Sequence, residues 1–270
     1  MSNRAFYAIV IGVIVTLYCL LSPMIKCERF ENGNLQVVTV ITDESNENYQ
    51  KLKRVAELHG IPVVGLVSSE RIGHGFGFGM KLKMLSDYIQ ALPDNKLIVF
   101  VDGYDVLITA PNASEIERRY LQLTRGSGKA LFSAEMTCWP DAHLSTSYPK
   151  CKSEYKYLNA GTLMAPVKTF KRIFELCPIP TDKAELLALD DQRYYTKFYL
   201  TDVGKDHILL DHSNEIFNCM AGGTHHLHFD PDGNKWFNKS TGTYPIIYHA
   251  NGSAQIKDFL YQKIYPTQDK

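Results

Sequence analysis

Short apolar runs rich in β-branched residues alternate with segments of helical spacing along most of the chain. Such runs are typical of buried strands, whereas apolar residues three and four positions apart predict one face of a helix. Strands are therefore expected at 36–42, 62–67, 97–102, 129–134, 157–164, 207–210 and 245–248. Helices are expected at 47–59, 80–91 and 114–123, with a further helix after Asp190. This alternation predicts an α/β fold built on a parallel, doubly wound sheet.

The N-terminus has a different pattern, because residues 5–25 contain no charged side chain. Twenty-one helical residues span roughly 31 Å, about the thickness of the hydrocarbon core of a membrane. Two interpretations remain open for residues 1–26: an uncleaved signal-anchor in the membrane, or a secretory signal peptide that is removed. Both place the rest of the chain in the secretory pathway, facing the ER or Golgi lumen, or secreted after cleavage. We expect a short linker at 27–35 and one domain at 36–270.

Charge and cysteine content narrow the function classes. The chain has 29 Lys and Arg residues against 29 Asp and Glu residues, so it has no basic excess of the kind that nucleic-acid binding needs. Its six cysteines form no CxxC pair, which argues against a zinc or thioredoxin-like site. Cys138 and Cys151 bracket a polar loop, and we expect them to form a disulfide.

The most informative segment is LIVFVDGYDVLI at 97–108, in which a predicted strand leads directly into Asp102 and then Asp105. Ligands of open α/β sheets bind at the carboxyl ends of the strands, so these carboxylates lie where chemistry is expected. Two carboxylates on a turn suit a divalent cation that bridges a diphosphate. The alternative is a turn that only closes the strand, and the Asp-x-x-Asp spacing alone does not decide between them.

Three further positions carry polar groups at element ends. Asn159 lies in a strand-like run, Asp190 opens a helical segment, and His249 follows the last predicted strand. Each has a structural alternative, since Asp190 can act as a helix N-cap, Asn159 as a turn residue, and His249 as a buried structural histidine.

Seven blocks occur in order along the chain: VVTVIT, VFVDGYDVLI, LFSAEMTCWPD, YLNAG, DDQRYYTKFYL, LDHSNEIFN and PIIYHANG. With them, residues 36 to about 256 resemble the glycosyltransferase domain of the multifunctional procollagen-lysine hydroxylases. The resemblance implies a GT-A-type (Rossmann-like) fold, Mn²⁺ as cofactor, and UDP-glucose or UDP-galactose as donor. It also implies a hexose acceptor of the hydroxylysine or galactosyl-hydroxylysine type, in collagen or a related glycoprotein.

The resemblance also implies roles for individual residues, carried over by motif. The Mn²⁺ ligands correspond to Asp102, Asp105 and His249, and the aromatic residue that stacks on uracil corresponds to Tyr104. The other positions expected to contact the nucleotide sugar are Val40, Thr42, Lys81, Asn251, Gly252 and Gln192. In the sugar pocket, hydroxyl groups are expected to be oriented by Asp190, Asp191 and Asn159.

The chain departs from the family pattern at two places. The family tends to carry a tryptophan where this chain has Glu70 and Arg71, and a basic residue near the position of Gln255, with Lys257 as a candidate replacement. Both departures bear on sugar preference and rate more than on UDP binding. The resemblance thus implies a glycosyltransferase that retains the anomeric configuration, and we expect front-face attack by the acceptor because no residue identifies itself as a covalent nucleophile. The competing hypothesis is a lumenal UDP-sugar-binding or scaffolding module without turnover.

Overall fold

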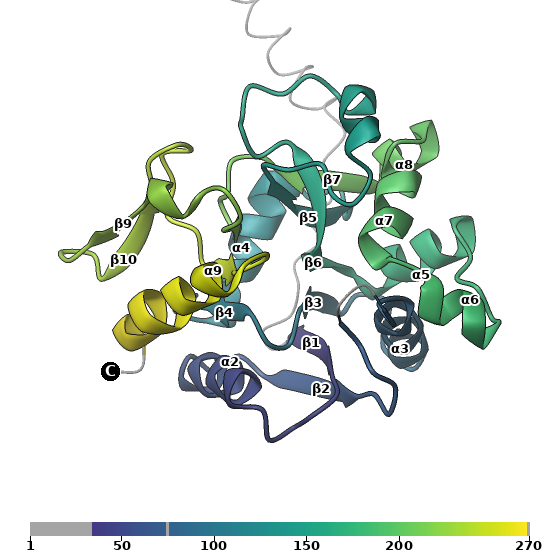
Figure 1. Cartoon of the computed structure of the whole chain (residues 1–270), viewed down its shortest axis with the longest axis horizontal. Helices are drawn as coiled ribbons and strands as arrows, with labels where there is room; N and C mark the ends of the chain where they lie inside the picture. The colour runs from purple at the N-terminus through teal and green to yellow at the C-terminus, as the bar shows by residue number, and fades with distance from the viewer. Residues whose placement is uncertain (1–33, 74–75, 269–270) are drawn as a thin grey trace, which may run out of the picture.

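The computed structural model describes residues 34–73 and 76–268, and its centre is a mixed sheet of six strands (Figure 1). The strands lie in the order β2-β1-β3-β6-β5-β7. Their ends differ from the predicted ones by at most two residues. In the spatial order given, the strands span Val63–Val67, Leu35–Ile41, Leu97–Val101, Tyr157–Pro166, Ala130–Glu135 and Ile208–Asp211.

The prediction of a parallel sheet is wrong at one strand. β6 pairs antiparallel with both β3 and β5, whereas the other pairs in this sheet are parallel. Neighbouring parallel strands need a crossover connection, usually a helix. The segment that joins β5 to β6 contains only the short 3₁₀ helix Ala142–Ser147, so β6 returns beside β5 in the opposite direction. The spacing of apolar runs in the sequence carries no information on this direction.

Helices cover both faces of the central sheet (Figure 1). One face packs against α3, α5 and α7, and the other packs against α2 and α4. The residues of β3 alternate between the two, because Ile98 and Phe100 belong to the first core and Leu97, Val99 and Val101 belong to the second. The helices span Glu47–Leu58 (α2), Gly79–Gln90 (α3), Ala113–Thr124 (α4), Val167–Leu176 (α5), Lys183–Ala188 (α6), Asp191–Tyr199 (α7), Asp202–His207 (α8) and Ala254–Phe259 (α9).

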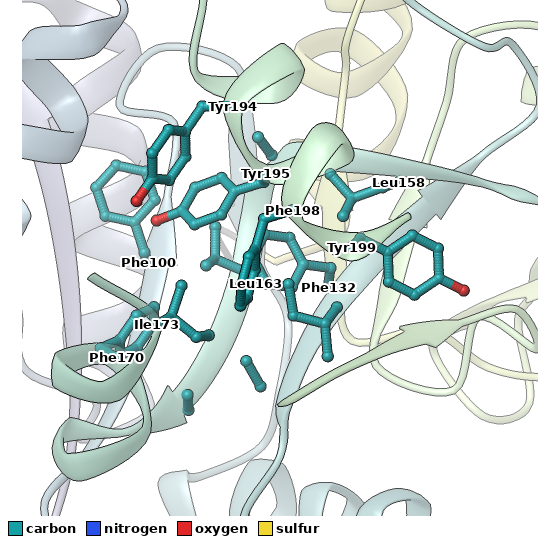
Figure 2. Packing of buried hydrophobic residues seen from close by; sticks show 14 of the residues in the cluster. Phe100, Phe132, Leu158, Leu163, Phe170, Ile173, Tyr194, Tyr195, Phe198 and Tyr199 are labelled. Atoms are coloured by element: carbon teal, nitrogen blue, oxygen red, sulfur yellow. The ribbon is translucent and has the colours of Figure 1, made fainter. Parts of the chain in front are cut away.

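Aromatic side chains of α7 fasten this helix to the sheet. Tyr195 and Phe198 point from the helix toward Phe132 of β5 and Leu163 of β6 (Figure 2). The rings of Phe132 and Tyr195 meet edge to face with their centroids 4.8 Å apart. Such contacts add to the apolar burial of both rings. The N-terminus of α7 is thereby held at the edge of the sheet where the strands end.

A smaller sheet lies beside the carboxyl end of β3. It has the order β4-β11-β8, in which β11 is antiparallel to β4 and parallel to β8. A separate hairpin is formed by β9 and β10. Sequence reasoning predicted only β11 of these five strands, which are Val106–Ile108 (β4), Phe217–Cys219 (β8), Leu227–Asp230 (β9), Lys235–Asn238 (β10) and Ile247–His249 (β11).

The predicted disulfide is wrong, since Cys138 and Cys151 are both free. Each sulfur contacts its own turn: Cys138 Sγ donates to the carbonyl of Asp141 at 3.4 Å, and Cys151 Sγ accepts from the amide of Ser153 at 3.4 Å. The bracketing of a polar loop by two cysteines therefore did not indicate that the side chains meet.

The predicted membrane segment at 5–25, within the signal sequence expected at 1–26, lies outside the described residues. So does most of the linker predicted at 27–35. Among residues 34–73 and 76–268, no helix has the length and apolar character needed to span a bilayer.

Candidate active site

A cleft of about 770 Å³ opens where β1, β3 and β5 end. Its volume lies in the usual range for pockets that bind small ligands. The cleft is lined by every residue that the sequence predicted for the site, although these positions are spread over more than 200 residues of the chain. They are Val40, Thr42, Lys81, Asp102, Tyr104, Asp105, Asn159, Asp190, Asp191, Gln192, His249, Asn251 and Gly252.

Asp102 and Asp105 are placed by a change of sheet. β3 of the central sheet ends just before Asp102, and β4 of the small sheet begins just after Asp105. The backbone is anchored at both ends of this turn. The Asp102 amide donates to the carbonyl of Gly161 on β6, and the Asp105 carbonyl accepts from the amide of Ala250, both at 2.8 Å. The two carboxylates therefore lie on a turn that both sheets hold in place.

His249 reaches the same point because β11 pairs with β4, which places His249 opposite Val106. Its Nε2 lies 3.6 Å from Asp102 Oδ2 and 3.6 Å from Asp105 Oδ1. The three side chains offer ligand atoms that lie within 4.8 Å of one another, so the cluster could hold a metal ion. Two carboxylates and an imidazole form a mixed oxygen and nitrogen set that fits a divalent ion such as Mn²⁺.

Gly161 leaves room for this imidazole. A Cβ atom at position 161 would lie 2.1 Å from His249 Cε1 and 2.8 Å from Asp102 Oδ2. Such distances are far inside van der Waals contact, so any larger residue would displace the histidine or the aspartate. The glycine of the block YLNAG is thus required by the approach of β6 to the cluster.

Lys81 lies between two of the carboxylates. Its Nζ is 2.8 Å from Asp102 Oδ1 and 2.7 Å from Asp191 Oδ2, and the residue is buried. Burial alone would lower the pKa of Lys81, but the two carboxylates outweigh it and raise the pKa above its usual value. Lys81 is therefore a fixed cation that connects α3, the aspartate turn and the start of α7.

Tyr104 is fastened to the end of β1 by its hydroxyl group. The hydroxyl oxygen accepts from the backbone amides of Thr42 and Asp43, at 2.7 and 2.8 Å. The carbonyl of Tyr104 accepts from the hydroxyl of Tyr261 at 2.8 Å. The aromatic ring is thus held at the cleft with its polar end occupied, which leaves the ring itself as the contact surface for a ligand.

Two of the predicted residues also have structural contacts. Asp190 is the N-cap of α7, since its Oδ1 accepts from the amide of Arg193 at 2.8 Å. Asn251 Oδ1 accepts from the amides of Met220 and Ala221, at 3.0 and 3.1 Å. The capping alternative for Asp190 is thereby confirmed, and the residue lines the cleft as well.

Comparison with protein families decides the identity of the domain. The family model described as the PLOD GT domain matches residues 31–264. The chain belongs to this family of glycosyltransferase domains.

Several proteins are similar in sequence to this PLOD-family domain. The multifunctional procollagen lysine hydroxylase and glycosyltransferase LH3 of Homo sapiens is 31% identical over 235 residues, which cover 83% of this chain and 30% of the relative. The uncharacterized protein R699 of Acanthamoeba polyphaga mimivirus is 37% identical over 180 residues, which cover 66% of this chain and 36% of the relative. The chain thus spans about a third of the length of these relatives.

A solved structure has the same fold at low sequence identity. The crystal structure of a glycosyltransferase involved in the glycosylation of the major capsid of PBCV-1 matches with a TM-score of 0.52 and 11% identity. The match covers 84% of this chain and 98% of that one. At this identity the likeness concerns the fold of the PLOD-family domain and not its substrates.

Glu135 and Trp139 are among the residues of the cleft of this PLOD-family domain that the sequence prediction missed. Glu135 is the last residue of β5 and is buried, and Trp139 is 63% exposed although it lines the cleft. Burial raises the pKa of Glu135 to about 7, opposed by its hydrogen bonds. Glu135 could have been predicted from the sequence because it is a charged residue at the end of an apolar strand, which is the pattern that pointed to Asp102.

The departures from the family pattern have partners in the structure. Glu70 pairs with Lys183 at 2.6 Å. Lys257, two residues after Gln255, lines the cleft and places its Nζ 3.4 Å from Asp105 Oδ2. A basic side chain therefore lies at this end of the cleft of the PLOD-family domain.

Proposed function

We propose that this domain is a Mn²⁺-dependent GT-A glycosyltransferase that moves glucose or galactose from a UDP-sugar to hydroxylysine-linked or related glycoprotein acceptors. The observation that carries the proposal is the meeting of Asp102, Asp105 and His249 in a cleft of ligand size. Mn²⁺ bound by these residues would neutralise the charge that develops on the departing UDP. The relatives named as glycosyltransferases support the reaction class, and the name procollagen lysine hydroxylase supports the acceptor.

Different residues of the cleft would contact different parts of the nucleotide sugar. The ring of Tyr104 beside Thr42 offers a flat apolar surface for uracil at the end of β1. Gly252, with φ +113°, and Asn251 form a tight loop that leaves room for the diphosphate. Lys81 adds a fixed positive charge close to the carboxylate cluster. The nucleotide is thereby oriented before any chemical step.

The sugar and the acceptor would then occupy the part of the cleft near the start of α7. Asp190, Asp191 and Gln192 line it together with Asn159 and can orient hydroxyl groups. In front-face attack, the acceptor oxygen bonds to the anomeric carbon as the bond from that carbon to the UDP oxygen breaks. The acceptor proton passes to that departing oxygen, so the chain needs no covalent nucleophile and the anomeric configuration is retained.

A second candidate is a UDP-sugar-binding or scaffolding module of the secretory lumen without turnover. It is favoured by the lysines that already contact the proposed metal ligands, Lys81 at Asp102 and Lys257 at Asp105. A module of this kind would bind UDP-sugar and release no UDP from it.

Release of UDP separates the two candidates. The full chain would be incubated with UDP-glucose or UDP-galactose, in Mn²⁺ or in EDTA, with and without a collagen peptide that carries hydroxylysine or galactosyl-hydroxylysine. The glycosyltransferase hypothesis predicts UDP release that needs both Mn²⁺ and an acceptor. Binding of the donor without release under every condition would leave only the binding module.

A further inference from the structure

Glu135 collects hydrogen bonds from three parts of the chain that are distant in sequence. Its Oε1 accepts from the side-chain amides of Asn159 and Gln192, at 3.1 and 2.7 Å. Its Oε2 accepts from the side-chain amide of Asn251 at 2.9 Å. β6, α7 and the loop after β11 thus meet at one buried carboxylate.

These contacts fix which way the Asn159 amide points. Asn159 Oδ1 accepts from the backbone amide of Gly161 at 2.9 Å, and a backbone N–H can only donate. On the other side, Asn159 Nδ2 faces the carboxylate of Glu135, which accepts. Exchanging the oxygen and nitrogen of this amide would place two donors together on one side and two acceptors on the other.

The orientation of Asn159 in turn determines the proton position on His249. The ring atom His249 Nδ1 lies 3.0 Å from Asn159 Oδ1. Because that oxygen can only accept, Nδ1 must carry the proton. In the neutral imidazole Nε2 is then unprotonated, and Nε2 is the atom that faces Asp102 and Asp105 at 3.6 Å.

We infer that Glu135 and Asn159 are positioning residues that hold His249 as the Nδ1-protonated tautomer, so that Nε2 presents its lone pair to the metal. The inference rests on the proposed function in that it assigns a metal to this cluster. Partners of this kind fix both the tautomer and the ring orientation of histidine ligands, and their loss typically costs 10- to 100-fold in metal affinity.

The tautomer itself can be observed without metal, nucleotide or turnover. Long-range ¹H–¹⁵N spectra of the metal-free full chain, labelled at histidine, distinguish protonated from unprotonated ring nitrogens in mildly alkaline buffer. The signal of His249 is assigned by its loss in His249→Gln. We expect wild type to show a proton on Nδ1 and Asn159→Ala to shift the proton toward Nε2.

The affinity for Mn²⁺ provides the second measurement, by electron paramagnetic resonance of the free ion. We expect about 10- to 100-fold weaker binding in Asn159→Ala and about tenfold weaker binding in Glu135→Gln. A glutamine offers one acceptor to three amides, so one of them loses its partner. Glu117→Gln is the matched control, because Glu117 is a buried glutamate of α4 outside the cleft, and it should bind Mn²⁺ like wild type.

Two results would overturn the inference. One is a neutral His249 ring in the metal-free wild type with its proton on Nε2 and none on Nδ1. The other is wild-type Mn²⁺ affinity in a folded Glu135→Gln protein and in a folded Asn159→Ala protein. If His249 has the expected tautomer but the protein releases no UDP, the transferase hypothesis is contradicted and this inference is not. If His249 has the opposite tautomer and UDP release depends on Mn²⁺, only the inference is contradicted.

Discussion

Two buried carboxylates lie at the ends of neighbouring strands and differ in which groups donate hydrogen bonds to them. Glu135 ends β5, and Asp211 ends the parallel strand β7 beside it. Asp211 accepts from the backbone amides of Glu215, Ile216 and Phe217, at 3.0, 2.8 and 3.0 Å. Among the described residues, the carboxylate of Glu135 accepts from side-chain amides alone, and these come from distant parts of the chain.

The difference separates a residue that shapes the fold from one that belongs to the cleft. Backbone donors within six positions make Asp211 the anchor of its own loop, much as an N-cap anchors a helix. The side chains that donate to Glu135 belong to residues that line the cleft. This carboxylate therefore holds cleft side chains in place and does not fix the path of its own loop. Removing a cleft carboxylate should therefore impair function without lowering stability at neutral pH, whereas removing Asp211 should lower stability and leave function intact.

The largest effect is expected for a cleft carboxylate that is a proposed metal ligand. Asp105→Asn should lower Mn²⁺-dependent UDP release at least about 100-fold, because the cation that neutralises the leaving group is lost. The thermal unfolding midpoint should stay the same or rise, since burial and the charge of Asp102 already raise the pKa of Asp105. A steady-state assay and a melting curve test both statements. Asp94→Asn, which alters an exposed carboxylate paired with Lys171, is the matched control.

The next effect is a pH dependence that Glu135 imposes on stability. Burial raises its pKa from 4.5 to about 7, so the unfolded chain loses this proton before the folded chain does. Ionisation of Glu135 therefore destabilises the folded state. As the pH rises from 4.5 to 7, this group lowers the free energy of unfolding by up to about 3 kcal/mol. Urea unfolding of wild type and Glu135→Gln across this range should show the difference. A constant difference over the range would mean that burial does not perturb this carboxyl group.

Asp211→Asn should cost about 2 kcal/mol of unfolding free energy, because one oxygen remains to accept from three amides that are otherwise buried. The turnover number of the folded fraction should match that of wild type, since Asp211 does not line the cleft. Urea unfolding measures the free energy of unfolding. Titration of the active site with UDP gives the concentration of folded protein, by which the turnover number is calculated. Loss of turnover with full stability would reverse the roles assigned to the two carboxylates.

The smallest effect is expected at Glu117, a third buried carboxylate. Its Oε1 has no hydrogen-bond partner among the described residues, and burial raises its pKa. Glu117→Gln should raise the free energy of unfolding at neutral pH by less than about 1 kcal/mol, because a neutral amide is less costly to bury. A decrease in the free energy of unfolding by a similar amount would instead indicate that the charged Glu117 side chain makes a stabilising contact.

Glu135 and Asp102 also mark the limit of what the sequence could predict. Asp102 was found because the apolar strand before it and the aspartate after it are close in sequence. Glu135 was missed because the predicted strand ended one residue earlier and its three partners come from other elements. The reversed direction of β6 and the small sheet that places His249 beside Asp105 are likewise set by long-range pairing. No local pattern records such pairing.

The role of the metal in nucleotide binding tests the central claim most directly. Calorimetric titration of the full chain with UDP would be carried out in Mn²⁺ and again in EDTA, with His249→Ala as the variant that lacks one proposed ligand. Bridging of a diphosphate by a metal at Asp102, Asp105 and His249 predicts tight binding in Mn²⁺, at least about tenfold weaker binding in EDTA, and no Mn²⁺ effect in the variant. Equal UDP affinity of the wild type in Mn²⁺ and in EDTA would contradict it.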